Sequence, residues 1–266
     1  MGHLQRRVRQ LIVLVPPAAA VAVATVVSLA VAGCAVQASE PPASITDVEP
    51  PATTPVASNV DDALAATVGT VERDSRRRQA RRLTLRLRNA SCVGVSTGSG
   101  FAITREILIT NRHVLAGAET LEVSTWNGRT LEVVAAAVGR LGDIGLARVE
   151  GSLPEPAKLA SAAAGPGDDV TVVGYPLGGP LTLRRGTVVD RVDGQRFGVG
   201  GDVLRLDADV RPGSSGGPVL DARNHVVAVV FALETSSDLA LAIPVDTMVT
   251  IIEAGGYEPV PACSES

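Results

Sequence analysis

A glycine-rich turn with serines is the first candidate for chemistry in this chain. Residues 213–219 read G-S-S-G-G-P-V, so a hydroxyl stands in a tight turn just before an apolar run. A serine hydroxyl is a weak nucleophile unless a neighbouring base accepts its proton. The turn therefore predicts nucleophilic catalysis only if a histidine and an acid are available to serve Ser215.

Two upstream motifs supply the base and the acid. One reads T-N-R-H-V around His113, and the other reads D-I-G-L starting at Asp143. The other two histidines, His3 and His225, lie in the basic N-terminus and in a polar turn. The order His113, Asp143, Ser215 therefore predicts a catalytic triad, in which the base activates the nucleophile and the acid orients the base.

With these three motifs the chain resembles the chymotrypsin-like serine peptidases, in particular their bacterial trypsin-like and HtrA-like branch. T-N-R-H-V, D-I-G-L and G-S-S-G-G-P carry the resemblance and occur in the order of the family. Weaker support comes from G-S-G-F-A-I at residues 98–103 and V-V-G-Y-P at residues 172–176. The resemblance covers roughly residues 83–250 and implies a serine endopeptidase that acts on polypeptides.

The resemblance also implies how the site works. Ser215 attacks the peptide carbonyl, His113 takes its proton and returns it to the leaving amine, and Asp143 stabilises the imidazolium. The backbone N–H groups of Gly213 and Ser215 form the oxyanion hole, where glycine suits a backbone conformation that disfavours a Cβ. Ser214 stands where digestive enzymes carry an aspartate, so activation by a newly cut N-terminus is not expected.

Substrate specificity has two interpretations. Asp209 lies six residues before Ser215, the place that sets a preference for Arg or Lys in trypsin. The HtrA-like branch folds this loop differently, and Asp207 or Asp209 is then structural. Val230, Phe231 and Ala232 are expected to form the strand that pairs with substrate by β-augmentation.

The stretch from Leu83 onward predicts an all-β domain. Short runs of apolar and β-branched residues alternate with Gly, Pro, Asn and Asp, which is typical of a sandwich or barrel. The runs are 83–88, 121–123, 131–138, 145–149, 170–173, 181–189, 203–207, 226–231 and 239–243. The resemblance narrows this to two six-stranded β-barrels with the site between them, and residues 246–255 suit a closing C-terminal helix. Only 51 residues follow Ser215. They are too few to form both the rest of the second barrel and a PDZ domain.

The N-terminus predicts a membrane tether. Three arginines in the first ten residues precede a 23-residue uncharged run, residues 11–33, which is long enough to span a bilayer. The basic flank places the N-terminus in the cytoplasm and the rest on the outer face of a bacterial cytoplasmic membrane. The run ends in V-A-G-C, which resembles a lipobox with Cys34 as the lipidated residue. An uncleaved anchor helix is the alternative.

Three segments follow from this reading. Residues 1–34 are the targeting or anchor segment, 35–82 a Pro/Ala-rich disordered stalk and basic linker, and 83–266 the protease domain. A short helix is possible from Asp61. Outside the membrane thiols tend to pair, so Cys92 and Cys263 are expected to form a disulfide, with two free thiols as the alternative.

Composition limits the partners. The net charge of −4 gives no reason to expect nucleic acid, and no metal cluster, nucleotide loop or cofactor motif occurs in the sequence. The sequence does not indicate an oligomeric state. Because fold does not imply function, two alternatives to an active protease stay open: a catalytically suppressed peptide-binding or stress-sensing module on the same fold, and a peptide-binding chaperone without turnover.

Overall fold

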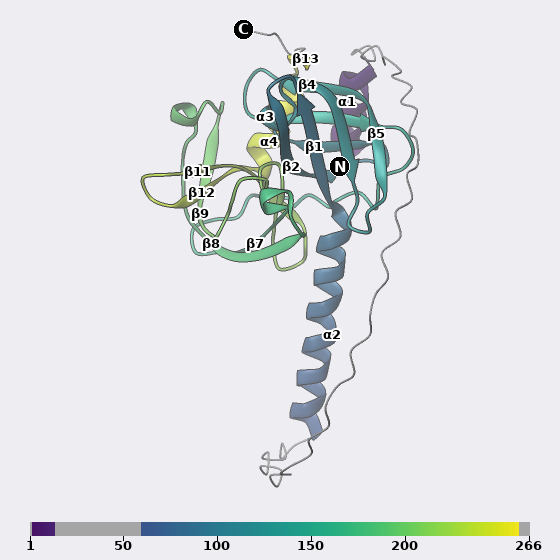
Figure 1. The fold of residues 1–266 in the computed structure, drawn as a ribbon. Helices are drawn as coiled ribbons and strands as arrows, with labels where there is room; N and C mark the ends of the chain where they lie inside the picture. Colours follow the sequence, from purple (N-terminus) through teal and green to yellow (C-terminus); the bar gives the residue numbers. More distant parts are fainter. Residues whose placement is uncertain (1, 14–59, 261–266) are drawn as a thin grey trace, which may run out of the picture. The chain divides into compact units, whose positions relative to one another are not determined.

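Two closed, six-stranded antiparallel β-barrels make up the centre of the computed structural model, which describes residues 2–13 and 60–260 (Figure 1). A short C-terminal helix follows the second barrel. The prediction of an all-β fold with two barrels and a C-terminal helix is therefore confirmed.

The first barrel is closed by pairing of its fifth and sixth strands, in the order β5-β4-β1-β2-β3-β6. In β1 the side chains of Leu85 and Leu87 are fully buried while Arg88 is exposed, as the alternating sequence predicts. The strands are β1 (Thr84–Ser91), β2 (Gly94–Ala102), β3 (Ile107–Thr110), β4 (Ala118–Ser124), β5 (Thr130–Gly139) and β6 (Gly145–Val149). A short strand, β13 (Tyr257–Pro259), pairs with residues 137–139 at the end of β5, beyond the residues that pair with β4.

The second barrel has the order β10-β11-β12-β9-β8-β7 and is filled almost entirely by small aliphatic side chains such as Val172, Leu204 and Val219. This agrees with a sequence that has only 2% aromatic residues. Its strands are β7 (Asp169–Gly174), β8 (Thr182–Asp193), β9 (Asp202–Asp207), β10 (Pro218–Leu220), β11 (Val226–Glu234) and β12 (Leu239–Pro244). Two 3₁₀ turns, η1 (Pro176–Gly178) and η2 (Gln195–Phe197), lie in its loops.

The two barrels share one apolar cluster. Phe101 and Ile109 from the first barrel and Val229 from the second belong to it, and so do Met248 and Ile252 of helix α4 (Val245–Ala254). All five side chains are fully buried. Because removing apolar surface from water is the dominant favourable term in folding, this cluster holds the barrels together and fixes the surface between them.

Helix α2 (Val60–Leu83) precedes the first barrel, where a short helix from Asp61 and a basic linker were expected. Its residues are mostly good helix formers, Ala, Arg, Gln and Glu, with no proline, so the segment favours a helix over a disordered stalk. The amide of Asn224, in the turn between β10 and β11, donates to the Arg76 carbonyl at 2.9 Å and to Gln79 Oε1 at 3.0 Å. The Arg76 guanidinium in turn donates to the Ala222 carbonyl at 2.9 Å.

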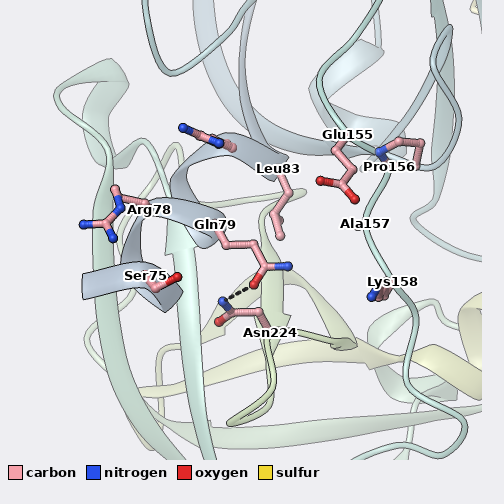
Figure 2. A pocket seen from close by; sticks show the side chains of 10 residues that line it. Ser75, Arg78, Gln79, Leu83, Glu155, Pro156, Ala157, Lys158 and Asn224 are labelled. Carbon is pink, nitrogen blue, oxygen red and sulfur yellow. Dashed lines mark hydrogen bonds between the residues drawn. The ribbon is translucent and has the colours of Figure 1, made fainter. Parts of the chain in front are cut away.

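A pocket of about 240 Å³ lies beside this contact, between the end of α2, the segment 155–158 and Asn224 (Figure 2). Figure 2 shows the hydrogen bond from Asn224 to Gln79 at its edge. None of its lining residues belongs to the predicted triad.

Helix α1 (Gly2–Val13) packs against helix α4 and strands β5 and β6. Leu4, Val8 and Ile12 recur every four residues and are buried in the cluster that contains α4. Gln5 donates from Nε2 to the Ile103 carbonyl at 3.1 Å. No helix within residues 2–13 and 60–260 is long and apolar enough to cross a membrane, and most of the predicted apolar run falls outside those ranges.

Candidate active site

His113 and Asp143 meet on the first barrel. His113 is the second residue of α3 (Arg112–Leu115), a single turn that follows β3 directly, and Asp143 stands just before β6, the partner of β3. The imidazole Nδ1 lies 2.6 Å from Asp143 Oδ2, and the backbone N–H of His113 donates to Oδ1 at 3.0 Å. Both carboxylate oxygens are thereby engaged. The His113 side chain keeps half its surface exposed, so Nε2 has room to act on a substrate.

Asn111 supports this pair and was not singled out from the sequence. Its side chain donates from Nδ2 to the Asp143 carbonyl at 2.7 Å, and the residue is fully buried. Since Asn111 immediately precedes α3, one side chain ties the histidine turn to the aspartate loop. The sequence feature that could have pointed to Asn111 is its place in the T-N-R-H-V motif, two residues before His113.

The Ser215 turn is built around two glycines with positive φ. Gly213 has φ +93° and Gly216 has φ +83°, values that L-residues with a Cβ rarely adopt. A Cβ on Gly216 would collide with the Ser99 carbonyl and the Thr110 hydroxyl of the first barrel. The turn therefore lies directly against the end of β3, three residues before His113.

Each carbonyl from residue 212 to 215 is engaged in a hydrogen bond. Leu177 N–H donates to the Pro212 oxygen at 2.6 Å, and Ser99 donates to Gly213 and Ser215 at 2.7 and 2.8 Å. The oxygen of residue 214 accepts from Gly217 N–H at 2.9 Å. The N–H groups of Gly213 and Ser215 take part in none of these bonds.

In a trans peptide the N–H points opposite to the C=O, so these two donors face away from the contacts that hold the turn. That is the arrangement that an oxyanion hole needs. No hydrogen bond joins the His113 imidazole to the Ser215 hydroxyl among the described residues; such contacts are often long in unliganded enzymes and tighten with substrate.

The predicted substrate strand lies next to the Ser215 turn. Val230 donates to the Gly217 carbonyl at 3.0 Å and accepts from Gly216 N–H at 2.8 Å. Beyond it the register of β11 with β12 shifts at Phe231, and β10, the neighbour on the other side, pairs only with residues before Val230. The backbone at Phe231 and Ala232 thus lies at a sheet edge that an extended peptide can join.

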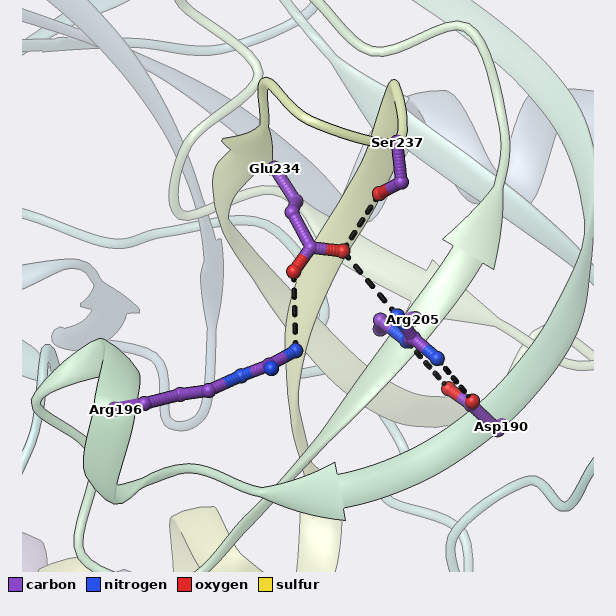
Figure 3. A network of polar contacts seen from close by, with 5 residues as sticks. All are labelled: Asp190, Arg196, Arg205, Glu234 and Ser237. Carbon is purple, nitrogen blue, oxygen red and sulfur yellow. Dashed lines mark hydrogen bonds and ion pairs between the residues drawn. The ribbon is translucent and has the colours of Figure 1, made fainter.

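A charged network supports the hairpin that carries this edge (Figure 3). Glu234, the last residue of β11, accepts from Arg196 at 3.0 Å, from Ser237 at 2.6 Å and from Arg205 at 3.4 Å, and Arg205 also forms a two-pronged ion pair with Asp190. The hydrogen bond from Ser237, followed by that from Arg205, lowers the pKa of Glu234. The hydrogen bonds from Arg205 lower the pKa of Asp190.

Beside the same hairpin is an open groove of about 430 Å³. Its walls are the η2 turn, with Arg196 and Phe197, and the β11–β12 hairpin from Phe231 to Ser236 with Leu241. The groove continues the sheet edge away from Ser215 along β11.

Asp209 does not line either pocket described above. Its side chain is half exposed and forms ion pairs with Arg184 at 3.7 Å and with Arg211 at 3.3 Å. A carboxylate that selects Arg or Lys should instead be free to receive the substrate's charge. This placement gives no support to the trypsin-like interpretation and agrees with the structural one.

The predicted cysteine sites are only partly described. Cys92 lies in the exposed turn between β1 and β2, whereas Cys263 and Cys34 fall outside the described residues. Both the Cys92–Cys263 disulfide and the lipidation of Cys34 stay predictions. Within the described ranges no group of three or more His, Cys, Asp or Glu side chains is arranged to hold a metal ion.

A match to a known protein family identifies the domain that carries these residues. Residues 98–229, which include His113, Asp143 and Ser215, match the family of the trypsin-like peptidase domain. The chain carries a trypsin-like peptidase domain. The resemblance inferred from three short motifs is thereby confirmed.

Relatives of this trypsin-like peptidase domain include the serine protease Rv3671c of Mycobacterium tuberculosis, 33% identical over 147 residues, or 53% of this chain and 37% of that protein. The putative serine protease HhoB of Synechocystis is 32% identical over 165 residues, covering 59% and 39% of the two chains. Serine protease HTRA1B of Danio rerio is 28% identical over 58% of this chain and 34% of its own. The chain thus spans well under half the length of the curated relatives it matches.

Solved structures give the same family for the trypsin-like domain. The active form of the M. tuberculosis Rv3671c protease has a TM-score of 0.63 and 27% identity, over 83% of this chain and all of that one. The inactive form of the same protease has a TM-score of 0.61 and 25% identity, over 70% and 95%.

Proposed function

We propose that the protein is a serine endopeptidase that hydrolyses peptide bonds of extracytoplasmic proteins through an acyl-enzyme intermediate. Ser215 is the nucleophile, His113 the general base and then acid, and Asp143 the group that holds the imidazole tautomer. The observation that carries the proposal is the His113–Asp143 pair on one barrel, with the Ser215 turn packed against Thr110 from the other. The relatives named serine proteases support the same reaction class.

The two N–H groups of Gly213 and Ser215 are assigned to the oxyanion of the tetrahedral intermediate. Each such donor typically contributes about 3–4 kcal/mol to transition-state stabilisation. The edge of β11 at Phe231 and Ala232 binds the substrate as an added strand and aligns the scissile carbonyl with Ser215. Backbone pairing of this kind accepts many sequences, which suits unstructured polypeptides as substrates.

Labelling with a fluorophosphonate tests the assignment of the nucleophile. The full-length protein should be modified at Ser215, and Ser215→Ala should abolish both the label and hydrolysis of an unstructured protein. Ser214→Ala is the matched control, because it removes the neighbouring hydroxyl of the same turn. Absence of label on the wild-type protein would favour a catalytically suppressed peptide-binding module. Loss of label in Ser214→Ala alone would mean that the nucleophile is residue 214.

We also propose that the enzyme acts on the outer face of the bacterial cytoplasmic membrane, tethered through residues 1–34. Lipidation at Cys34 and an uncleaved apolar helix over residues 11–33 are the two forms of this tether. Mass spectrometry of the membrane-extracted N-terminus separates them, since the first gives a chain that starts at an acylated Cys34 and the second an intact start. A soluble chain that begins after Ala38 would rule out both.

A further inference from the structure

Ser99 has no place in the proposed catalytic triad, yet it makes two hydrogen bonds to the Ser215 turn. It lies on β2 of the first barrel and is fully buried at the junction with the second. Its backbone N–H donates to the Ser215 carbonyl at 2.8 Å, and its hydroxyl lies 2.7 Å from the Gly213 carbonyl. Both flanks of residue 214 are thus held from one position on the opposite barrel.

The hydroxyl hydrogen of Ser99 has one possible direction. The backbone N–H of Tyr175 lies 2.9 Å from Ser99 Oγ and can only donate, so Oγ accepts there. The single hydroxyl hydrogen must then go to the Gly213 carbonyl, which can only accept. The chain of bonds from Tyr175 N–H through Ser99 to Gly213 is therefore directional, and it links the loop after β7 to the oxyanion turn.

This loop holds the turn at a second point. Leu177, in left-handed backbone conformation with φ +54°, donates its N–H to the Pro212 carbonyl at 2.6 Å. The Pro212 oxygen and the Gly213 N–H belong to the same peptide group, so binding the oxygen to Leu177 aims the N–H the other way. Ser99 fixes the next peptide through its oxygen. Rotation of the Pro212–Gly213 peptide would turn the Gly213 N–H away, and the adjoining Gly213–Ser214 peptide, held by Ser99, restrains that rotation from the other side of Gly213.

The geometry points to Ser99 as a positioning residue: it fixes the Gly213–Ser214 peptide, which directly follows the peptide whose N–H the oxyanion requires, and so restrains the backbone at Gly213. This inference rests on the proposed peptidase function and adds to it a residue that touches neither the substrate nor the reacting atoms. Ser99 joins three segments that are far apart in sequence, the strand before the histidine, the V-G-Y-P loop and the nucleophile turn. Without its hydroxyl, the Tyr175 N–H and the Gly213 carbonyl lose their partner in a buried place.

The test compares three substitutions in the full-length protein. Ser99→Ala removes the hydroxyl, Ser99→Cys keeps nearly the same shape but is a weak donor and acceptor, and Ser96→Ala is the same change at an exposed position of the same strand. Removal of one oxyanion donor lowers kcat by about 10²–10³, so disordering it should lower kcat at least about tenfold in both Ser99 variants. KM should change less than about threefold, and Ser96→Ala should match the wild type.

A contact that only stabilises the fold would lower the melting temperature of Ser99→Ala without changing kcat well below that temperature, and that outcome would overturn the inference. So would a Ser99→Cys variant with wild-type kcat, because volume alone would then suffice. Hydrogen exchange of the segment 172–178 gives a reading independent of turnover: it should accelerate in both Ser99 variants, also in a Ser215→Ala background. The two proposals can also fail separately. If exchange accelerates in the Ser99 variants but the wild-type protein neither hydrolyses substrate nor reacts with a fluorophosphonate, the structural role of Ser99 is supported and the peptidase function is refuted.

Discussion

Gly213→Ala adds a side chain to the oxyanion turn at a position where the structure leaves little room. An added Cβ would lie 2.5 Å from the Tyr175 carbonyl oxygen and 2.8 Å from the Leu177 nitrogen, both backbone atoms. Ordinary contact begins near 3.4 Å, so the turn or its neighbour must move by about 0.9 Å. A displacement of about 1 Å at a catalytic group can cost about 100-fold in rate, and we expect kcat to fall by about that factor.

Gly167→Ala is the control for the backbone strain alone. Gly167 has φ +87°, close to the +93° of Gly213, but a Cβ there meets nothing within 4 Å. Both variants carry the strain of a left-handed alanine, about 1–2 kcal/mol, which lowers the melting temperature by a few degrees in a domain of this size.

The assay measures kcat and KM on an unstructured protein or peptide well below both melting temperatures, after counting active sites. Gly167→Ala should keep wild-type kcat, while Gly213→Ala should lose about 100-fold with little change in KM. If the two variants have kcat values within about threefold of each other, the crowding at Gly213 does not control the oxyanion site and the reasoning fails.

Three further outcomes follow from particular side chains. The hydroxyl of Tyr175 is buried without a hydrogen-bond partner, so Tyr175→Phe should keep or slightly raise the melting temperature; a clear drop in thermal unfolding would contradict this. Since the pKa of Glu234 is lowered in the folded state, its stabilising effect should be present above the ordinary carboxyl pKa of about 4.3 and disappear as the pH falls through the lowered value. The difference in melting temperature between wild type and Glu234→Gln should accordingly be largest near pH 7 and shrink as the pH falls below the ordinary carboxyl pKa, and a pH-independent difference would refute the assignment. Val8 is fully buried in α1, and a span over residues 11–33 or cleavage before Cys34 would remove α1 from the barrels. In the intact chain studied without a membrane, Val8→Asp should therefore cost roughly 2 kcal/mol or more while the exposed Gln10→Asp costs little; equal melting temperatures would show that α1 is not docked.

The fold could be predicted from the sequence because its strands have simple patterns. The alternation from Leu85 to Arg88 and the apolar run of β11 have the periodicity of half-buried and buried strands, and Gly and Pro mark most of the turns. The pairing order was not in these local patterns. It came from three motifs in the order of a known family.

The site was predictable for residues that bear chemistry and not for those that hold them. His113, Asp143 and Ser215 are recognisable by type and spacing. Ser99 and Asn111 instead act through contacts with residues that are distant in the sequence, by 114 positions for Ser99 and by 32 positions for Asn111. A short helix from Asp61 was predicted as possible, but its full extent as α2 was not, because the basic run from Arg76 to Arg82 was interpreted as a linker.

The return of the chain to the first barrel affects the order in which the molecule can be assembled. β13 pairs with β5, with Tyr257 opposite Gly139, so a strand of the first barrel gains its partner only after the whole second barrel has been made. During synthesis from the N-terminus, His113 and Asp143 are made before any strand of the second barrel. On the proposed mechanism, hydrolytic competence therefore arises only after the chain has passed Ser215.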